Sequence, residues 1–254
     1  MYGPGLLSPT IIDTGTFRLI EGSASVILLD IEGTTVPMEF VHDTLFKYAE
    51  DRVQDFIDRR GSEEEVQKCL FSLESEMRKA VNAGLQNQHD MGKASIAQYA
   101  RMLMENDSKL PAPKALQGLI WEEGYADNGL KSEVYPDVPG ALENWKSAGK
   151  EVCIYSSGSA LGQKLLFSHT AYGDLTKLIA DFFDTTVGPK RDPGSYVNIA
   201  RQLKTEPAKI LFFSDVVEEL DAAASAGMKV MLVDRTAGFR ERKTRYPVIQ
   251  TFMQ

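Results

Sequence analysis

Four short, almost continuously apolar segments set the fold class of this chain. Two of them lie at the ends of similar segments, SAGKEVCIY and SAGMKVMLV. In each segment a helical pattern ends at a glycine and a buried strand follows. Strands without a polar face that alternate with helices are typical of a parallel sheet covered on both sides. The sequence therefore predicts an α/β fold with a doubly wound parallel sheet. The four predicted strands are residues 25–29, 151–155, 209–213 and 229–233.

The long stretch between the first two strands has a different pattern. From Val41 to Phe56 and beyond, apolar residues recur at helical spacing, which predicts amphipathic helices and no strand. We expect an all-helical cap domain inserted into the sheet domain. The chain before the first strand contains several glycines and prolines and is expected to carry at most a short strand near residues 16–20. The predicted parts are an extension at 1–24, an α/β core at 25–42 and 133–254, and a helical cap at 43–132.

Composition excludes several classes of protein. The 254 residues include 28 Lys+Arg and 36 Asp+Glu, a formal net charge of −8, whereas nucleic-acid-binding proteins usually carry a basic excess. No apolar run reaches the roughly 18 residues that a membrane span needs. The two cysteines, Cys69 and Cys153, are too few for a disulfide-stapled secreted domain. We expect a cytoplasmic protein, with nuclear residence left open, that has a small molecule as its partner and binds neither nucleic acid nor membrane.

Polar residues stand directly after three of the predicted strands. Asp30 and Glu32 follow the first strand, Ser156 and Ser157 the second, and Asp215 the third. Ligands of open parallel sheets bind beyond the carboxyl ends of the strands, so these side chains are expected to converge. Carboxylate oxygens are the ligands that Mg²⁺ prefers, commonly one or two of them together with a phosphate. The sequence therefore predicts a site for Mg²⁺ and a phosphorylated molecule.

These residue types can carry out phosphoryl transfer. A carboxylate such as Asp30 can attack phosphorus to form an aspartyl-phosphate. Glu32, two residues along an extended segment, points to the same side and can protonate the leaving oxygen and then deprotonate water. The serine hydroxyls can donate to phosphate oxygens, and Lys190 or Arg191 can supply the positive charge that the transferring group needs.

Two other functions fit the pattern less well. A dehalogenase that works without a metal would not need Asp215 and Glu32 together. A phospho-accepting signalling receiver is shorter and places its aspartate after the third strand, whereas the candidate nucleophile here follows the first. A phosphatase that acts on another small phosphorylated metabolite remains the alternative.

Four segments also carry a resemblance to a known family. LLDIEGTT, IYSSGS, GPKRDPGSY and FFSDVVEE resemble, in this order, the four motifs of the haloacid-dehalogenase-like phosphatase superfamily. DIEGTT, with Glu where most members have a second Asp, is similar to the enolase-phosphatases of methionine salvage, also called acireductone synthases. The resemblance extends over residues 25–235 and is stronger in the predicted sheet than in the helical insertion.

The resemblance implies a specific reaction and a set of site residues. The enzyme would be a phosphoric monoester hydrolase, usually monomeric, with a single Mg²⁺ per chain. It would enolise 2,3-diketo-5-methylthiopentyl 1-phosphate and then remove the phosphate to give the acireductone 1,2-dihydroxy-3-keto-5-methylthiopentene, while the cap closes the site. The metal would be held by Asp30 and Asp215 through their side chains and by Glu32 through its backbone carbonyl; the phosphate would be bound by Ser156, Ser157 and Lys190.

Two questions stay open at the level of sequence. The base that takes the proton during enolisation is either Glu32 or a residue of the cap. The fourth motif reads Ser-Asp-Val-Val-Glu-Glu, whereas many superfamily members have Gly-Asp with a second Asp downstream. Glu218 or Glu219 is therefore expected to support the site from outside the metal ligands.

Overall fold

The chain divides into two compact units. The computed structural model describes residues 12–82, 93–106, 108, 110–236 and 244–253. The described residues of Met1–Met38 and Ser132–Gln254 form one unit, and those of Glu39–Lys131 form the other. The first unit contains the sheet and the second is helical.

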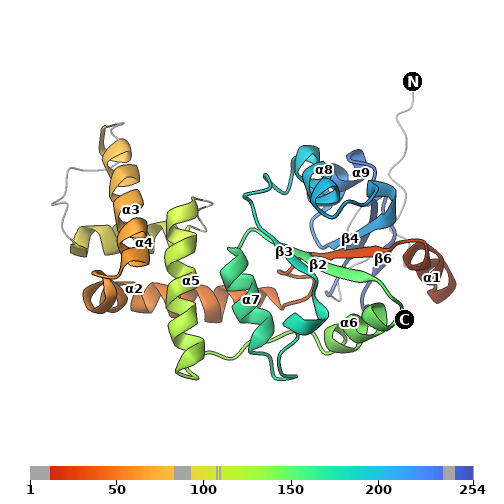
Figure 1. Cartoon of the computed structure of the whole chain (residues 1–254), viewed down its shortest axis with the longest axis horizontal. Helices are drawn as coiled ribbons and strands as arrows, with labels where there is room; N and C mark the ends of the chain where they lie inside the picture. Colours follow the sequence, from red (N-terminus) through yellow and green to blue (C-terminus); the bar gives the residue numbers. More distant parts are fainter. Residues whose placement is uncertain (1–11, 83–92, 107, 109, 237–243, 254) are drawn as a thin grey trace. The chain divides into compact units, whose positions relative to one another are not determined.

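In the described part of the chain, the sheet has six strands in the order β3-β2-β1-β4-β5-β6, and every neighbouring pair is parallel (Figure 1). From the central strand β1 the chain builds outward to β2 and β3 on one side, and then to β4, β5 and β6 on the other. This doubly wound sheet confirms the predicted fold class. The strands are β1 (Val26–Leu29), β2 (Glu151–Tyr155), β3 (Asp181–Phe183), β4 (Ile210–Ser214), β5 (Lys229–Val233) and β6 (Val248–Ile249).

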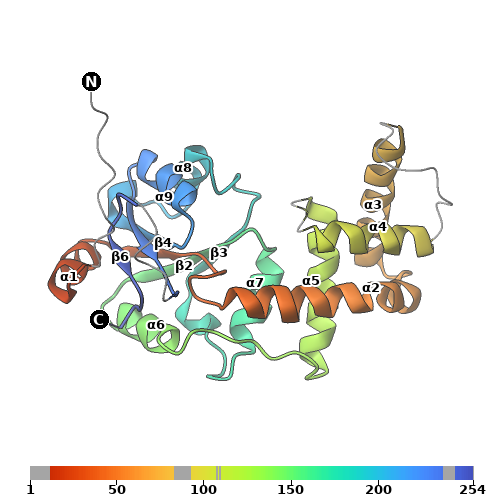
Figure 2. The same cartoon turned by 180° about the vertical axis from the view of Figure 1, so that it is seen from behind.

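Helices cover both faces of the sheet (Figures 1 and 2). On the face of α8 and α9, Tyr196 and Leu220 pack into a core with Phe212 of β4. On the opposite face, Trp145 of α6 stacks on Phe213 with ring centroids 5.9 Å apart. Side chains of alternate strand residues are thus buried on both faces, which is why the strands do not alternate between apolar and polar residues. The helices of this unit are α1 (Thr14–Gly22), α6 (Val138–Ser147), α7 (Ala160–Ser168), α8 (Pro193–Gln202) and α9 (Val217–Ser225), with short 3-10 helices at Thr176–Leu178 and Pro207–Lys209.

The helical unit begins with a π-helix, Phe40–Phe46, that runs directly into α2. Inside the unit, Trp121 donates its indole N–H to the Leu45 carbonyl at 2.8 Å. The sequence placed the start of this region at residue 43, whereas the unit runs from Glu39 to Lys131 because the π-helix already packs against α2. Its α-helices are α2 (Lys47–Arg60), α3 (Glu64–Asn82), α4 (Lys93–Glu105) and α5 (Pro111–Ala126).

The structure corrects one sequence expectation and adds two strands. Residues 16–20, expected as at most a strand, lie in helix α1, whose first turn is capped by the Asp13 carboxylate accepting the Thr16 N–H at 2.9 Å. The sequence did not predict β3 or β6, which are too short to show a pattern of their own. None of the helices in the described ranges is long and apolar enough to span a membrane.

Candidate active site

Strand β1 lies between β2 and β4, so the loops that follow these three strands are neighbours at one edge of the sheet. Leu29 at the end of β1 is in register with Ile154 of β2 and Phe213 of β4. The backbone N–H of Asp30 continues this ladder and donates to the Phe213 carbonyl at 3.0 Å. The end of the central strand is therefore rigidly placed, and the first polar side chain beyond it is Asp30.

The Asp30 carboxylate is buried, with 4% of the residue exposed, and it accepts hydrogen bonds from three donors. Its Oδ1 accepts the Ile31 N–H at 2.7 Å and the Lys190 ammonium at 2.6 Å. Its Oδ2 lies 3.2 Å from the Ser214 hydroxyl. A buried carboxylate needs such partners because an unpaired charge is costly in the protein interior. These contacts hold Asp30 in one orientation with its charge available for chemistry.

A tight turn brings Asp215 close to the segment that follows Asp30. The Ile31 carbonyl accepts the N–H groups of Thr34, Thr35 and Val36 at 3.2, 2.9 and 2.9 Å. Gly33 sits in this turn at φ +66°, where a side chain would be strained. A Cβ at Gly33 would lie 2.4 Å from Asp215 Oδ2, so the glycine is what lets this carboxylate approach the turn.

Glu32 belongs to the same turn and is half-buried, with its residue bridged to Val36. The turn therefore gathers the three predicted metal ligands: Asp30 begins it, Glu32 lies within it, and Asp215 packs against it. In the described part of the chain, no group of three or more His, Cys, Asp or Glu side chains is arranged to hold a metal ion. A metal here would need backbone or substrate oxygens beside the two aspartates, which is the donor set expected for Glu32 acting through its carbonyl.

Of the two candidate cations, Lys190 contacts the site carboxylates. The Lys190 ammonium lies 2.6 Å from Asp30 Oδ1 and 2.7 Å from Glu219 Oε2, and its side chain is 10% exposed. Arg191 is exposed. Burial by itself lowers the pKa of Lys190, but the two adjacent carboxylates outweigh it, and the pKa is raised overall. Lys190 is therefore charged at neutral pH.

Glu219 is the site residue that sequence reasoning left undefined. It lies in the first turn of α9, buried, whereas its neighbour Glu218 is exposed. Burial first, and then the charge of Asp30, raise the pKa of Glu219 to about 7 despite the contact with Lys190. The Ser214 hydroxyl lies between the two carboxylates, 3.0 Å from Glu219 and 3.2 Å from Asp30. Since a hydroxyl has a single proton, Ser214 can donate to only one of the two carboxylates at a time.

The serines after β2 lie in a loop that is supported by hydrogen bonds from Gln163 of α7. Ser156 is buried, and its hydroxyl oxygen accepts the Gly158 N–H at 3.2 Å, which leaves the hydroxyl proton available to a ligand. Ser157 is half-buried beside it. The buried Gln163 amide donates to the carbonyls of Gly158 and Phe183 at 2.9 and 2.8 Å and so ties this loop to the end of β3.

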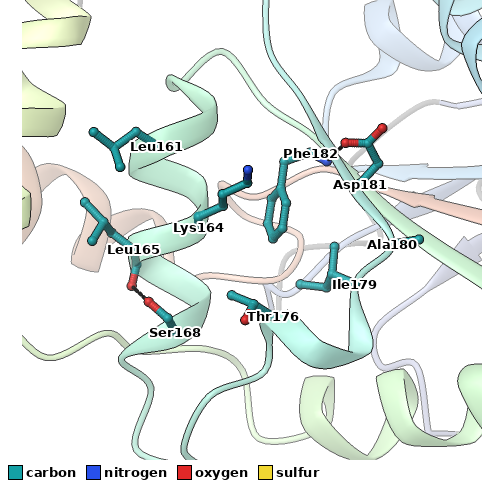
Figure 3. A pocket seen from close by; sticks show the side chains of 9 residues that line it. All are labelled: Leu161, Lys164, Leu165, Ser168, Thr176, Ile179, Ala180, Asp181 and Phe182. Atoms are coloured by element: carbon teal, nitrogen blue, oxygen red, sulfur yellow. Dashed lines mark hydrogen bonds between the residues drawn. The ribbon is translucent and has the colours of Figure 1, made fainter.

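A separate cavity of about 420 Å³ lies at the edge of the sheet, between α7 and the segment leading into β3 (Figure 3). The Asp181 carboxylate there accepts the N–H of its own neighbour Phe182, and the Lys164 ammonium lies 6.0 Å from the Phe182 ring. None of the predicted site residues lines this cavity. Its lining residues are Leu161, Lys164, Leu165, Ser168, Thr176, Ile179, Ala180, Asp181 and Phe182.

Comparisons with known proteins show which family the chain belongs to. The family model of haloacid dehalogenase-like hydrolases matches residues 24–227. The enolase-phosphatase E1 of Drosophila melanogaster is 40% identical over 239 residues, which cover 91% of this chain and 93% of the relative. That of the bacterium Thioalkalivibrio sulfidiphilus is 43% identical over 227 residues, which cover 89% and 96%.

A solved structure also matches nearly the whole chain. The crystal structure of UTR4 protein from Saccharomyces cerevisiae superimposes with a TM-score of 0.74 at 32% identity and covers 91% of this chain and 99% of its own. The matches span both units and nearly the whole length of the relatives. The chain therefore belongs to the haloacid dehalogenase-like hydrolases and, among them, to the enolase-phosphatase family.

Proposed function

We propose that this protein is a Mg²⁺-dependent enolase-phosphatase that converts 2,3-diketo-5-methylthiopentyl 1-phosphate to the acireductone 1,2-dihydroxy-3-keto-5-methylthiopentene. The observation that carries the proposal is the Asp30 carboxylate. It is buried at the end of the central strand and bound to Lys190, and its turn contacts Asp215. This arrangement occurs in a chain that is 40–43% identical to proteins named enolase-phosphatase E1.

The donor set fits Mg²⁺. Two aspartate side chains, Asp30 and Asp215, and the backbone carbonyl of Glu32 are all hard oxygen ligands, and a substrate phosphate can complete the shell. The close approach of Asp215 to the turn at Gly33 supports this assignment, because it places both carboxylates at one turn. When bound, Mg²⁺ supplies charge neutralisation at the phosphate and polarises the oxygens of the substrate.

The phosphatase half follows from the groups around Asp30. One Asp30 oxygen attacks phosphorus, an O–P bond forms, and the bond from phosphorus to the leaving oxygen breaks. Glu32 protonates that oxygen and then takes a proton from the water that hydrolyses the aspartyl-phosphate. An ammonium has three N–H donors, so Lys190 can contact a phosphate oxygen beside its carboxylate partners, with Ser156 and Ser157 donating to the remaining oxygens.

The enolase half needs a base next to the substrate carbonyls. Glu32 is our candidate within the sheet unit, because it lies in the same turn as Asp30 and carries a longer side chain. Glu32→Gln is expected to abolish enol formation if Glu32 is the base. If the enol still forms with this variant while phosphate release is slow, the base lies elsewhere in the chain and Glu32 serves the second step alone.

The proposed function is tested with purified protein, Mg²⁺ and the diketo phosphate. The ultraviolet absorbance of the enol and the concentration of free phosphate are followed in the same sample. Enol that appears before phosphate is the expected result, and EDTA is expected to suppress turnover until Mg²⁺ is restored. Phosphate release without any enol would leave a phosphatase for another small phosphorylated metabolite, which is the alternative function.

We also propose that the enzyme works as a monomer in the cytoplasm on this small substrate. The net charge of −8 supports the absence of a nucleic-acid partner, because phosphate backbones require basic excess. Light scattering at working concentration is expected to give a mass near 28.2 kDa.

A further inference from the structure

Four consecutive backbone carbonyls that lead up to and include Lys190 each accept a hydrogen bond from a side chain. We call residues 187–190 the lysine loop. Loops usually satisfy their carbonyls with water or with their own backbone, so a run of four side-chain donors marks a built support. The bonds run from Asn198 Nδ2 to Val187 O at 3.0 Å, from Tyr155 Oη to Gly188 O at 2.8 Å, from Ser195 Oγ to Pro189 O at 2.7 Å and from Tyr196 Oη to Lys190 O at 2.7 Å.

These donors come from the rigid core of the sheet unit. Tyr155 is the last residue of β2 and Tyr196 lies in the first turns of α8, and both are completely buried. Their rings meet edge to face with centroids 5.5 Å apart. Burial raises the pKa of both phenols, that of Tyr155 to about 12, so both hydroxyls keep their protons and act as donors at neutral pH.

The lysine loop requires a glycine at its second position. Gly188 adopts φ +133°, a conformation open only to glycine, and a Cβ there would lie 2.2 Å from Ser195 Oγ. The Lys190 ammonium lies 5.9 Å from the centre of the Tyr155 ring. Tyr155, whose hydroxyl supports the loop, therefore also has its ring near the charged end of Lys190.

The geometry points to Tyr196 as a positioning residue for Lys190. A lysine stem has four flexible carbons, so the place of its ammonium depends on how firmly its own backbone is held. The Tyr196 hydroxyl fixes the carbonyl of Lys190 itself. It thereby holds the ammonium where it meets Asp30 and, on the proposed function on which this inference rests, the substrate phosphate. Tyr155 supports the Gly188 carbonyl, two residues earlier, in the same way.

Binding of inorganic phosphate to the full-length protein with saturating Mg²⁺ tests this role without relying on turnover. Tyr196→Phe removes one oxygen and keeps the packed ring. We expect its phosphate Kd, measured by calorimetry, to rise about 10-fold, the scale of one lost buried hydrogen bond. Its Mg²⁺ Kd is expected to stay within about 2-fold of wild type, because the turn after β1 is untouched. The matched control is Tyr246→Phe, whose hydroxyl donates to Asp221 away from the site.

The outcomes separate this inference from the proposed function. If the wild-type protein binds no phosphate, the proposed function fails and the inference fails with it. If the wild type binds phosphate and Tyr196→Phe binds it equally well, the inference alone is overturned. Should Tyr196→Phe not fold, as judged by circular dichroism, Tyr155→Phe takes its place with the same expectation.

A double-mutant cycle distinguishes positioning from general stabilisation. In a Lys190→Met background the ammonium is gone, so Tyr196→Phe is expected to lower the residual kcat/KM by less than about 2-fold. A loss of kcat/KM of about 10-fold in that background would show that Tyr196 acts independently of Lys190 and would overturn the inference.

Discussion

Two loops bring charged groups to the same site, and they are held in opposite ways. The turn after β1, residues 30–36, is built mainly from its own backbone: the Ile31 carbonyl accepts three N–H groups, and Gly33 supplies the positive φ. The lysine loop, residues 187–190, is supported by hydroxyl and amide groups of β2 and α8. The conformation of the first loop is therefore fixed by its own residues, whereas that of the second depends on hydrogen bonds from side chains of the core.

This difference has consequences for mutation. A change inside the turn after β1 is expected to damage the site directly, whereas a change in a distant supporting group should matter little there. For the lysine loop the reverse holds, because its carbonyls depend on side chains outside it. Four substitutions, ordered by the size of the expected loss of activity, test how far this contrast extends.

Asp30→Asn is expected to lower phosphate release by about 10⁴-fold or more, because the isosteric amide cannot attack phosphorus. The fold is expected to persist, since the amide occupies the same volume and Asp30 belongs to a turn held by backbone bonds. Phosphate release and circular dichroism measure the two effects. Turnover at the wild-type rate by a folded variant would remove Asp30 from the role of nucleophile.

Gly33→Ala is expected to lower kcat/KM by about 10²-fold, the scale of a displaced reacting group. The new Cβ would meet Asp215 Oδ2 at 2.4 Å and would force φ +66° on an L-residue at a cost of about 1–2 kcal/mol. The Mg²⁺ concentration for half-maximal activity is expected to rise with it.

The matched control for Gly33→Ala is Gly22→Ala at the end of α1. A Cβ there has nothing within 4 Å and meets no strained φ, so activity and Mg²⁺ dependence should stay as in the wild type. Equal behaviour of the two variants would contradict the view that the turn after β1 is built around its glycine.

Lys190→Ala is expected to raise the KM and lower kcat, with kcat/KM falling roughly 10- to 100-fold, because the phosphate loses its cationic partner. Arg191→Ala, which removes an exposed neighbouring charge, is the control and is expected to leave both constants unchanged. Steady-state kinetics on the diketo phosphate decide between them. The opposite pattern would transfer the phosphate contact to Arg191.

The same contrast explains which parts of the site could be predicted from sequence. Asp30, Asp215 and Ser156 follow apolar strands directly, so strand order alone brings them to one edge. Gly33 marks its own turn. Nothing local reveals that Glu219 faces the site while Glu218 faces solvent, because that depends on the direction of α9. Tyr155 ends an apolar strand and reads as core.

The fold shows the same limit. The strands β1, β2, β4 and β5 were predicted because each is a continuous apolar run. The strands β3 and β6, Asp181–Phe183 and Val248–Ile249, are too short to carry a pattern and exist through pairing with their neighbours. Helix α1 was missed because it is stabilised by the Asp13 cap and by a tertiary contact of Phe17. The ring centroids of Phe17 and Phe213 lie 6.5 Å apart.

Arg235 tests whether the turn after β1 is independent of distant groups, because it lies far away in the sequence and contacts this turn. Its guanidinium donates to the Thr34 carbonyl through Nε at 3.1 Å and Nη2 at 2.8 Å. It also pairs with the Asp137 carboxylate at 2.8 Å and lies 4.4 Å from the centre of the Tyr135 ring and 4.7 Å from that of Phe252. Arg235→Met is expected to lower the free energy of unfolding by about 3 kcal/mol, because it leaves the half-buried Asp137 carboxylate without its cation.

Activity should nevertheless be almost spared. Since the turn holds itself through Ile31 and Gly33, kcat/KM of folded Arg235→Met is expected to change by no more than about 3-fold, measured well below its Tm. Arg245→Met, at an exposed arginine paired with Asp221, controls for loss of charge and is expected to change neither quantity. A 10-fold loss of kcat/KM in folded Arg235→Met would mean that the turn after β1 is also held from a distance. The two loops would then both depend on distant side chains. Their different sensitivity to mutation would have to be explained by the strength of the individual supporting contacts.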